Sequence, residues 1–255
     1  MPGPRGLSGR LDATFTSRAD GSVQVHATTR PPLELRGPFA GRALPTYFLR
    51  NVTAGTLDGD DYEVNVRVES GADVRVEPTS ATKAYSALRR GVRSRVHLEA
   101  CPGATLQYSA GVTILHTDAC LEQTTDIVVH PGAAVAYLEV LALGRLARGE
   151  RLAFRRYSSS LRVRRPDATP MFEERLVLDP PAQRAAIDAA LDGAGVLGTL
   201  LLLGGDASEA PRLEDSATIY AGASLLPNGA GVIVRALGNR AEDIARYLEA
   251  VVAGQ

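Results

Sequence analysis

The sequence contains little cysteine, few aromatic residues and almost no lysine. Its two cysteines, Cys101 and Cys120, cannot form the disulfide framework of a small secreted protein. Tryptophan is absent and aromatic residues make up 5% of the chain, which leaves few of the rigid rings that build ligand pockets and base-stacking platforms. Lys83 is the one lysine among 28 basic residues, so arginine carries almost all of the positive charge.

A net charge of either sign is also missing. The 28 basic residues are offset by 29 acidic ones, which disfavours a general polyanion binder and nucleic acid as a partner. No apolar run approaches the length of about 20 residues that a membrane span needs, and the first ten residues lack the apolar segment of a signal peptide. We therefore expect a cytoplasmic globular protein without a membrane partner.

Alternating apolar and polar residues dominate the first two thirds of the chain. Residues 62–68 read YEVNVRV, which places four apolar side chains on one face of a strand. The same alternation recurs at residues 73–77, 94–99, 105–108 and 126–129. Because strands with one buried and one solvated face are typical of antiparallel layers, the pattern predicts a mainly β fold of stacked antiparallel sheets, with a β-rich core over residues 10–165.

A recurring turn separates several of these strands. The sequences ESGA, CPGA and HPGA contain Gly71, Gly103 and Gly132, which are 32 and 29 residues apart. Glycine permits the positive φ that a tight reversal needs. A quasi-repeat of about 30 residues suggests layers like those of a β-solenoid, and three ordinary hairpins in a sandwich are the alternative.

Helix signals are few and lie mostly near the C-terminus. The expected helices are a short one over residues 81–90, a second over 182–192 after the N-cap Asp179, and a last one that begins with a capping-box-like segment at 239–242 and ends at Val252. Residues 199–203 and 231–237 are expected to form strands. We predict a single domain over residues 1–255, in which residues 179–255 complete the β-rich core.

The motifs of common enzymes and metal sites are missing. The sequence has no nucleophile elbow, P-loop or dinucleotide-binding glycine motif, so we assign no catalytic residue and expect no enzyme. Its four histidines are scattered and no paired-cysteine motif occurs, which predicts no tight metal site and no tightly bound cofactor. The one close grouping is His116, Asp118 and Cys120, which would share one face of a strand.

Arginine is concentrated between Arg145 and Arg165, where eight arginines accompany one acidic residue, Glu150. This basic stretch supports an alternative function, that of an RNA-binding or regulatory β protein. Glu173, Glu174 and Asp179 follow soon after, so a self-neutralised solvated surface is the competing interpretation.

An ordered set of short segments resembles one known family. The segments are Gly59-Asp60 before the alternating strand, Ser70-Gly71-Ala72, PTSATKAY at residues 78–85, PGATLQY at 102–108, EVLALGR at 139–145 and RGE at 148–150. Together they resemble the urease accessory protein family UreD, also called UreH, over residues 10–155. The closing strand and helix over 232–252 are similar too.

The resemblance implies a non-enzymatic scaffold or chaperone for nickel insertion into urease. Such a protein joins urease apoprotein to UreF and, through UreF, to the GTPase UreG, and nickel is in transit rather than tightly bound. The absence of a tight ligand cluster is consistent with this role, because soft ligands would trap nickel instead of passing it on.

Polar residues on the family-like segments are the candidates for a nickel passage: Asp60, Thr79, Thr82 and Glu139. Glu139 is the strongest, because residues 136–143 are otherwise apolar and a carboxylate among them must be paired, hydrated or functional. An ion pair with Arg145 or another arginine is its alternative role, and an acid–base pair with Asp60 would be the enzymatic one. Turn or cap hydroxyls are the alternative for the two threonines. Lys83, Tyr85, Gly144 and Arg145 are the candidates for motif or interface positions.

Overall fold

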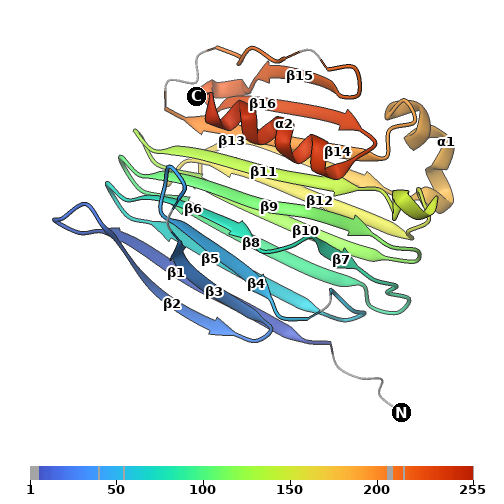
Figure 1. Cartoon of the computed structure of the whole chain (residues 1–255), viewed down its shortest axis with the longest axis horizontal. Coiled ribbons are helices and arrows are strands. Elements are labelled where there is room, and N and C mark those ends of the chain that lie inside the picture. The colour runs from blue at the N-terminus through green and yellow to red at the C-terminus, as the bar shows by residue number, and fades with distance from the viewer. Residues whose placement is uncertain (1–5, 40, 54, 206–208, 215, 255) are drawn as a thin grey trace.

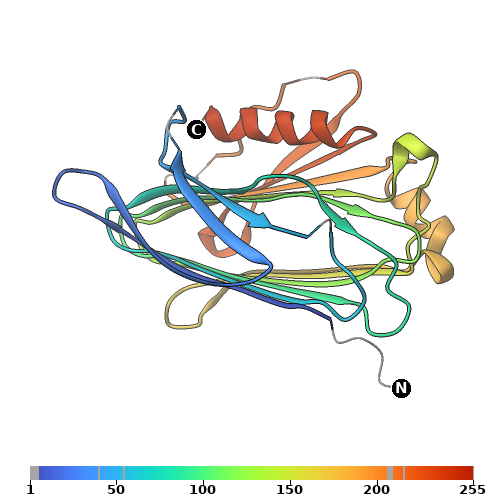
Figure 2. The ribbon, with the colours of Figure 1, turned by 60° about the horizontal axis from the view of Figure 1, so that its bottom comes forward.

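The structure is a computed structural model that describes residues 6–39, 41–53, 55–205, 209–214 and 216–254. Residues 1–5, which begin the N-terminal segment considered above, lie outside the described residues. Two β-sheets lie face to face, and their strands run along the long axis of the molecule (Figure 1; Figure 2). The fold is therefore mainly β, as predicted.

Sheet A has seven strands. Their order across the sheet is β13 (Pro170–Leu178), β12 (Arg156–Arg164), β10 (Cys120–Val129), β8 (Val92–Ala100), β5 (Asp61–Val68), β1 (Ser8–Ser17) and β2 (Val23–Arg30). Sheet B is ordered β15 (Tyr220–Leu225), β16 (Gly231–Gly238), β14 (Val196–Gly204), β11 (Ala134–Ala142), β9 (Thr105–Leu115), β6 (Asp73–Pro78), β4 (Thr46–Asn51) and β3 (Leu33–Phe39). The short β7 (Thr82–Ala84) also pairs with β9.

The centre of the fold is a two-layer solenoid. From β5 to β12 the chain alternates between the sheets, so that β5, β8, β10 and β12 stack in parallel in sheet A and β6, β9 and β11 do so in sheet B. The predicted β-solenoid-like layers are confirmed. The alternative of three hairpins is wrong, because each turn carries the chain from one sheet to the other.

The expected antiparallel pairing holds only at the flanks. It joins β1 to β2, β3 to β4, β12 to β13, and β14 to its neighbours β11 and β16. For the central strands the expectation is wrong. Alternation reveals that one face of a strand is buried, but the same alternation arises in parallel and antiparallel neighbours.

The three recurring turns make the crossings between sheets. Gly71, Gly103 and Gly132 have φ of 71°, 70° and 76°, the left-handed conformation that glycine adopts without a steric penalty. The turns close with hydrogen bonds that begin the next strand of sheet B, such as Ala104 N to Cys101 O at 3.0 Å. The repeat read from the sequence is thus the repeat of the solenoid.

The main core lies between the sheets, and a second core lies outside sheet B. In β5, Tyr62, Val64, Val66 and Val68 are buried and the residues between them are partly exposed. Helix α2 (Ala241–Ala253) covers the outer face of sheet B, where Ile244 and Leu248 are fully buried (Figure 2). Their spacing of four residues is the helical stripe that the sequence predicts.

The two helices predicted near the C-terminus are confirmed, but the helix predicted over residues 81–90 is wrong. Helix α1 (Pro180–Ala190) follows Asp179, and α2 begins after Arg240; neither N-cap residue makes a side-chain cap hydrogen bond. Two single-turn 3₁₀ helices, η1 (Leu146–Arg148) and η2 (Pro227–Gly229), complete the elements. Residues 81–90 form no helix, because residues 82–84 pair with the end of β9 instead.

The length and polarity of the helices bear on membrane crossing. Among the described residues, every helix is too short or too polar to traverse a lipid bilayer.

Candidate functional site

A cavity of about 330 Å³ lies between the two sheets. Tyr62, Val92 and Leu121, which stand at or near the starts of three stacked strands of sheet A, line one side. Three of the predicted site residues line the other side: Thr79, Thr82 and Lys83. The fold therefore brings the Thr-rich family-like segment to the wall of an interior space.

Asp60 lies outside the cavity and holds Tyr62, a residue of the cavity lining, in place by a hydrogen bond. Its Oδ2 accepts a hydrogen bond of 2.7 Å from the hydroxyl of Tyr62, which lines the cavity. Both carboxylate oxygens also accept backbone hydrogen bonds, from Leu7 N and Leu57 N, at 2.8 Å each. Asp60 is 3% exposed and does not itself line the cavity. Burial and the neighbouring Asp60 carboxylate raise the pKa of Tyr62, so the phenol stays protonated and donates.

Glu139 is reached from the cavity through Gln123. Gln123 lines the cavity and is 9% exposed. Its Nε2 donates to Oε2 of Glu139 at 2.8 Å, and the hydroxyl of Tyr137 donates to the same oxygen at 2.8 Å. Burial raises the pKa of Glu139. Among the described residues no cationic group lies within ion-pair distance of this carboxylate. Its hydrogen-bond donors are neutral, and the more distant charge of Arg235 also favours its ionised form.

A polar row continues from Glu139 across sheet B. Glu139 lies opposite Thr199 in the register of β11 and β14, and Thr199 lies opposite Arg235 in that of β14 and β16. Arg235 donates to the Thr199 hydroxyl and forms an ion pair with Glu174 of sheet A. We call the five residues Gln123, Glu139, Thr199, Arg235 and Glu174 the polar row.

The predicted alternatives for Glu139 can now be compared with its contacts. An ion pair with Arg145 is wrong, because the Nε of Arg145 donates to Glu150 at 2.7 Å. The enzymatic pair with Asp60 gains no support, since Asp60 is bound to Tyr62 while Glu139 is bound to Gln123 and Tyr137. Sequence reasoning missed Gln123, Thr199 and Arg235, because only the pairing of distant strands places them beside Glu139.

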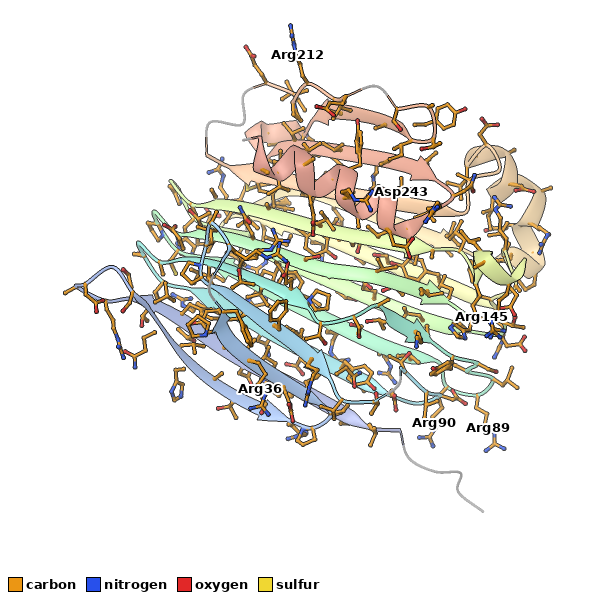
Figure 3. The ribbon with its side chains drawn as sticks, in the orientation of Figure 1. Arg36, Arg89, Arg90, Arg145, Arg212 and Asp243 are labelled. Atoms are coloured by element: carbon orange, nitrogen blue, oxygen red, sulfur yellow. The ribbon has the colours of Figure 1, made fainter. Side chains whose placement is uncertain are left out.

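The motif candidates near the end of β11 form a local structural unit. Gly144 has φ of 147°, and a Cβ there would lie 2.1 Å from the carbonyl oxygen of Glu150, so the loop closes only with glycine. The Glu150 carboxylate accepts hydrogen bonds from both Arg145 and Thr117. Arg145 lies at the same end of the molecule as Arg89 and Arg90 (Figure 3).

Tyr85 and the His116 segment meet at this end as well. The rings of Tyr85 and His116 contact edge to face, with centroids 4.8 Å apart. The expected strand through His116, Asp118 and Cys120 is wrong: residues 116–119 form a turn, and Cys120 begins β10. Burial and nearby cations, chiefly Arg145, lower the pKa of His116. The described residues form no group of metal ligands here.

Four of the eight arginines of the basic stretch form ion pairs with acidic residues. Arg145 contacts Glu150, Arg151 contacts Asp188, Arg156 contacts Asp179 at 3.8 Å, and Arg164 contacts Asp126 at 2.9 Å. Glu174, expected to neutralise this stretch, pairs with Arg235 instead. These contacts fit the self-neutralised surface better than a phosphate-binding one.

One group of potential metal ligands does exist in space, although the histidines are scattered in sequence. Glu99, Cys101 and His130 approach one another at the ends of β8 and β10. His130, scattered from the other histidines in sequence, thus lies beside two other potential ligands in space. The available sequence signal was the repeat, since Cys101 and His130 are both the first residue of a recurring turn.

Known proteins match the chain along almost its entire length. The sequence model of the family described as UreD urease accessory protein matches residues 7–254. Urease accessory protein UreD of Haloarcula marismortui is 35% identical over 97% of this chain and 86% of its own. The UreD proteins of Natronomonas pharaonis and Mycolicibacterium gilvum are 32% and 30% identical, covering 94% and 79% of this chain and 83% and 74% of their own.

Proposed function

Because the chain belongs to the UreD family of urease accessory proteins, we propose that it serves urease maturation as a non-enzymatic scaffold. In this role it links urease apoprotein to UreF and, through UreF, to the GTPase UreG. Nickel is the cargo of the assembly, and it passes through the protein without becoming a resident cofactor.

The observation that supports nickel passage is the connection between the cavity and the polar row. Thr79 and Thr82 contribute hydroxyl-bearing side chains to the cavity lining, and Gln123 connects the lining to the Glu139 carboxylate. Oxygen ligands of this kind bind a borderline cation such as Ni²⁺ more weakly than thiolate or imidazole clusters do. A hydrated cation can therefore exchange from one oxygen to the next.

Glu139 supplies the charge that draws a cation inward. Burial disfavours its ionised form, and a divalent cation nearby reverses that preference, because Coulomb attraction is strongest where water is scarce. Arg235 would repel a cation, but its charge is balanced by Glu174. The attraction between Glu139 and a cation is therefore not cancelled by repulsion from Arg235.

The test of passage is the substitution Glu139→Gln. Glutamine keeps the shape and can still accept hydrogen bonds from Tyr137 and Gln123, but it carries no charge. We expect normal folding and normal UreF binding, with less nickel in urease and less urease activity in a reconstituted activation assay. Glu122→Gln is the matched control, because Glu122 is exposed on strand β10 of sheet A, beside Gln123, and does not line the cavity. Normal nickel loading with Glu139→Gln would remove this residue from the mechanism.

The scaffold role has a separate test. Co-expression with UreF should give a complex that co-elutes in size exclusion, with an interface above about 1,000 Å². If both proteins are folded and elute apart, the link to UreF is refuted whatever the nickel assay shows.

A further inference from the structure

The recurring turns place three side chains in a ladder at one end of sheet A. Glu69, Cys101 and His130 are each the first residue of a turn, and the residues just before them, Val68, Ala100 and Val129, are paired in register across β5, β8 and β10. Glu99 precedes Cys101 by two residues and points to the same outer face. We call Glu69, Glu99, Cys101 and His130 the turn ladder.

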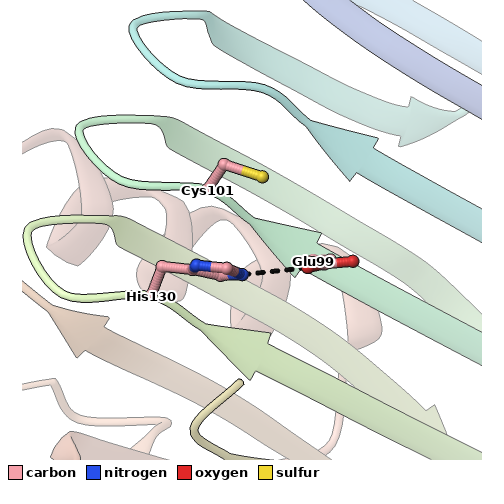
Figure 4. Close-up of side chains that lie close together, drawn as sticks. All are labelled: Glu99, Cys101 and His130. Atoms are coloured by element: carbon pink, nitrogen blue, oxygen red, sulfur yellow. Dashed lines mark hydrogen bonds and ion pairs between the residues drawn. The ribbon is translucent and has the colours of Figure 1, made fainter. Parts of the chain in front are cut away.

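The side chains of the turn ladder are in contact. His130 Nε2 lies 2.9 Å from Oε1 of Glu99, and the ligand atoms of Glu99, Cys101 and His130 all lie within 4.8 Å of one another. Glu69 lies near enough to the Cys101 thiol to raise its pKa, together with burial. Figure 4 shows the three residues on neighbouring strand–turn units. Cys101 is 3% exposed, whereas the side chains of His130 and Glu99 are 20% and 19% exposed, so a small ion can enter from solvent.

These distances suit a bound metal ion. Bonds of about 2.0–2.2 Å to nitrogen and oxygen place adjacent ligand atoms roughly 3 Å apart, which is the separation already present between His130 and Glu99. A metal–sulfur bond of about 2.3 Å then requires only a side-chain adjustment of Cys101, because the three ligand atoms already lie within 4.8 Å of one another. We propose that the turn ladder binds one divalent transition-metal ion of the Co²⁺, Ni²⁺ or Zn²⁺ type through Cys101 Sγ, His130 Nε2 and the Glu99 carboxylate. Imidazole and thiolate select such ions over Mg²⁺ and Ca²⁺.

The neighbouring charges can accommodate the ion. Arg67 contacts Glu99 at 2.5 Å and Glu69 at 2.7 Å. When Glu99 binds the metal, the guanidinium of Arg67 remains paired with Glu69. Burial and Glu69 raise the pKa of the Cys101 thiol to about 11. Metal binding therefore releases one proton to solvent. The resulting thiolate and the Glu99 carboxylate balance the two charges of the cation.

The site is separate from the proposed passage. Tyr62, Val92 and Leu121 line the cavity near the starts of the strands, while the turn ladder follows the ends of the same strands. The cavity lies between the sheets, whereas the turn ladder is on the outer face of sheet A. Its metal binding requires neither urease nor UreF, and a failure of the passage model would leave it intact.

Cobalt titration of the purified, tag-free full chain tests the proposal. Co²⁺ bound by a thiolate gives an intense sulfur-to-metal charge-transfer band, which carboxylate and imidazole ligands do not produce. We expect one Co²⁺ per chain with this band, and competition by Zn²⁺ and Ni²⁺. Cys101→Ser should abolish the band, and His130→Gln should weaken binding at least about tenfold.

Two substitutions provide matched controls. His97→Gln breaks a similar histidine–carboxylate contact, between His97 Nδ1 and Asp126 at 3.2 Å. Asp126 also pairs with Arg164, but this group contains no cysteine. Cys120→Ser removes the other thiol. Both variants should retain the charge-transfer band and the affinity of the parent chain.

Several results would overturn the site. They are the absence of Co²⁺ binding to the folded parent chain, binding without a thiolate band, and a band that persists in Cys101→Ser. Because the spectrum of the parent chain decides the first two, the test does not depend on whether any variant folds.

Discussion

The interior polar row and the turn ladder both involve strand β10, which carries Gln123 and ends just before His130, and yet they differ in chemistry. The polar row lies between the sheets and offers hydroxyl, amide and carboxylate groups, and its one guanidinium, that of Arg235, is paired with Glu174. The turn ladder lies on the outer face and combines sulfur, nitrogen and oxygen around an arginine. Ligands of the first kind let a cation exchange, and ligands of the second kind hold one.

The two regions also shift carboxylate pKa values in opposite directions. Burial raises the pKa of Glu139, whose nearest donors are neutral. Glu99 is desolvated too, but the hydrogen bond with His130 and the charge of Arg67 hold its pKa below the ordinary value. Both carboxylates are desolvated, so the direction of the pKa shift is decided by the groups beside them: neutral donors at Glu139, and a histidine and an arginine at Glu99.

The largest expected effect is at the cavity wall. Asp60→Ala leaves two backbone donors and the Tyr62 hydroxyl without an acceptor, at about 1–3 kcal/mol for each buried donor. We expect the free energy of unfolding to fall by at least about 3 kcal/mol, measured by denaturant titration. Asp58→Ala is the control: Asp58 also accepts three backbone hydrogen bonds, from Arg89, Arg90 and Gly91, but most of these are exposed. Equal losses in the two variants would show that burial is not the deciding factor.

A smaller effect is expected at the turns that carry the ladder. Gly103→Ala adds a methyl group that meets no atom within 4 Å, so its cost is the left-handed backbone alone, about 1–2 kcal/mol. Gly222→Ala, in strand β15 with equally open surroundings and no positive φ, should cause no loss. Thermal unfolding of the two variants separates backbone strain from crowding, and a loss in Gly222→Ala comparable to that in Gly103→Ala would contradict this assignment.

Glu99→Gln should destabilise the protein at neutral pH in a pH-dependent way. Because the folded-state pKa of Glu99 is lowered, its ionised form contributes stability above the unfolded pKa, and this contribution disappears as the pH falls through the folded pKa. The melting temperature of Glu99→Gln should therefore lie below that of the parent chain at pH 7 and approach it in acid. A difference that stays constant with pH would assign the loss to packing.

Glu139→Gln should show the opposite pH dependence, with the smallest effect of the series. Since its folded-state pKa is raised, the folded protein binds the proton more tightly, and the parent chain loses stability as the pH rises from the ordinary glutamate value through the folded one. Glutamine has no such loss. The melting temperature of the variant relative to the parent chain should rise between pH 4 and pH 8, and a fall over that range would refute the raised pKa.

Much of the local structure could be predicted from the sequence. Alternation over 62–68 identified β5 and its buried face, and the glycines at 71, 103 and 132 identified the turns. These signals are local: a strand with one buried face needs a period of two, and a reversal needs a positive φ. The apolar stripe of Ile244 and Leu248 likewise identified α2.

Two predictions failed for different physical reasons. Residues 81–90 have helical propensity, but backbone pairing of 82–84 with β9 outweighs it. Arg145 was a plausible partner for Glu139 in sequence, but a loop closed by Gly144 turns it toward Glu150 instead. In the first case a contact outside the segment decided the outcome, and in the second the closure of a local loop did.

The sequence by itself determined where the strands, the turns and the late helices form, because these depend on side chains within a few residues of one another. Only the tertiary structure decided that consecutive repeats stack in parallel. Since the partner of a strand is chosen by the whole sheet, residues 16 and 29 positions apart met only on folding: Gln123 with Glu139, and Cys101 with His130.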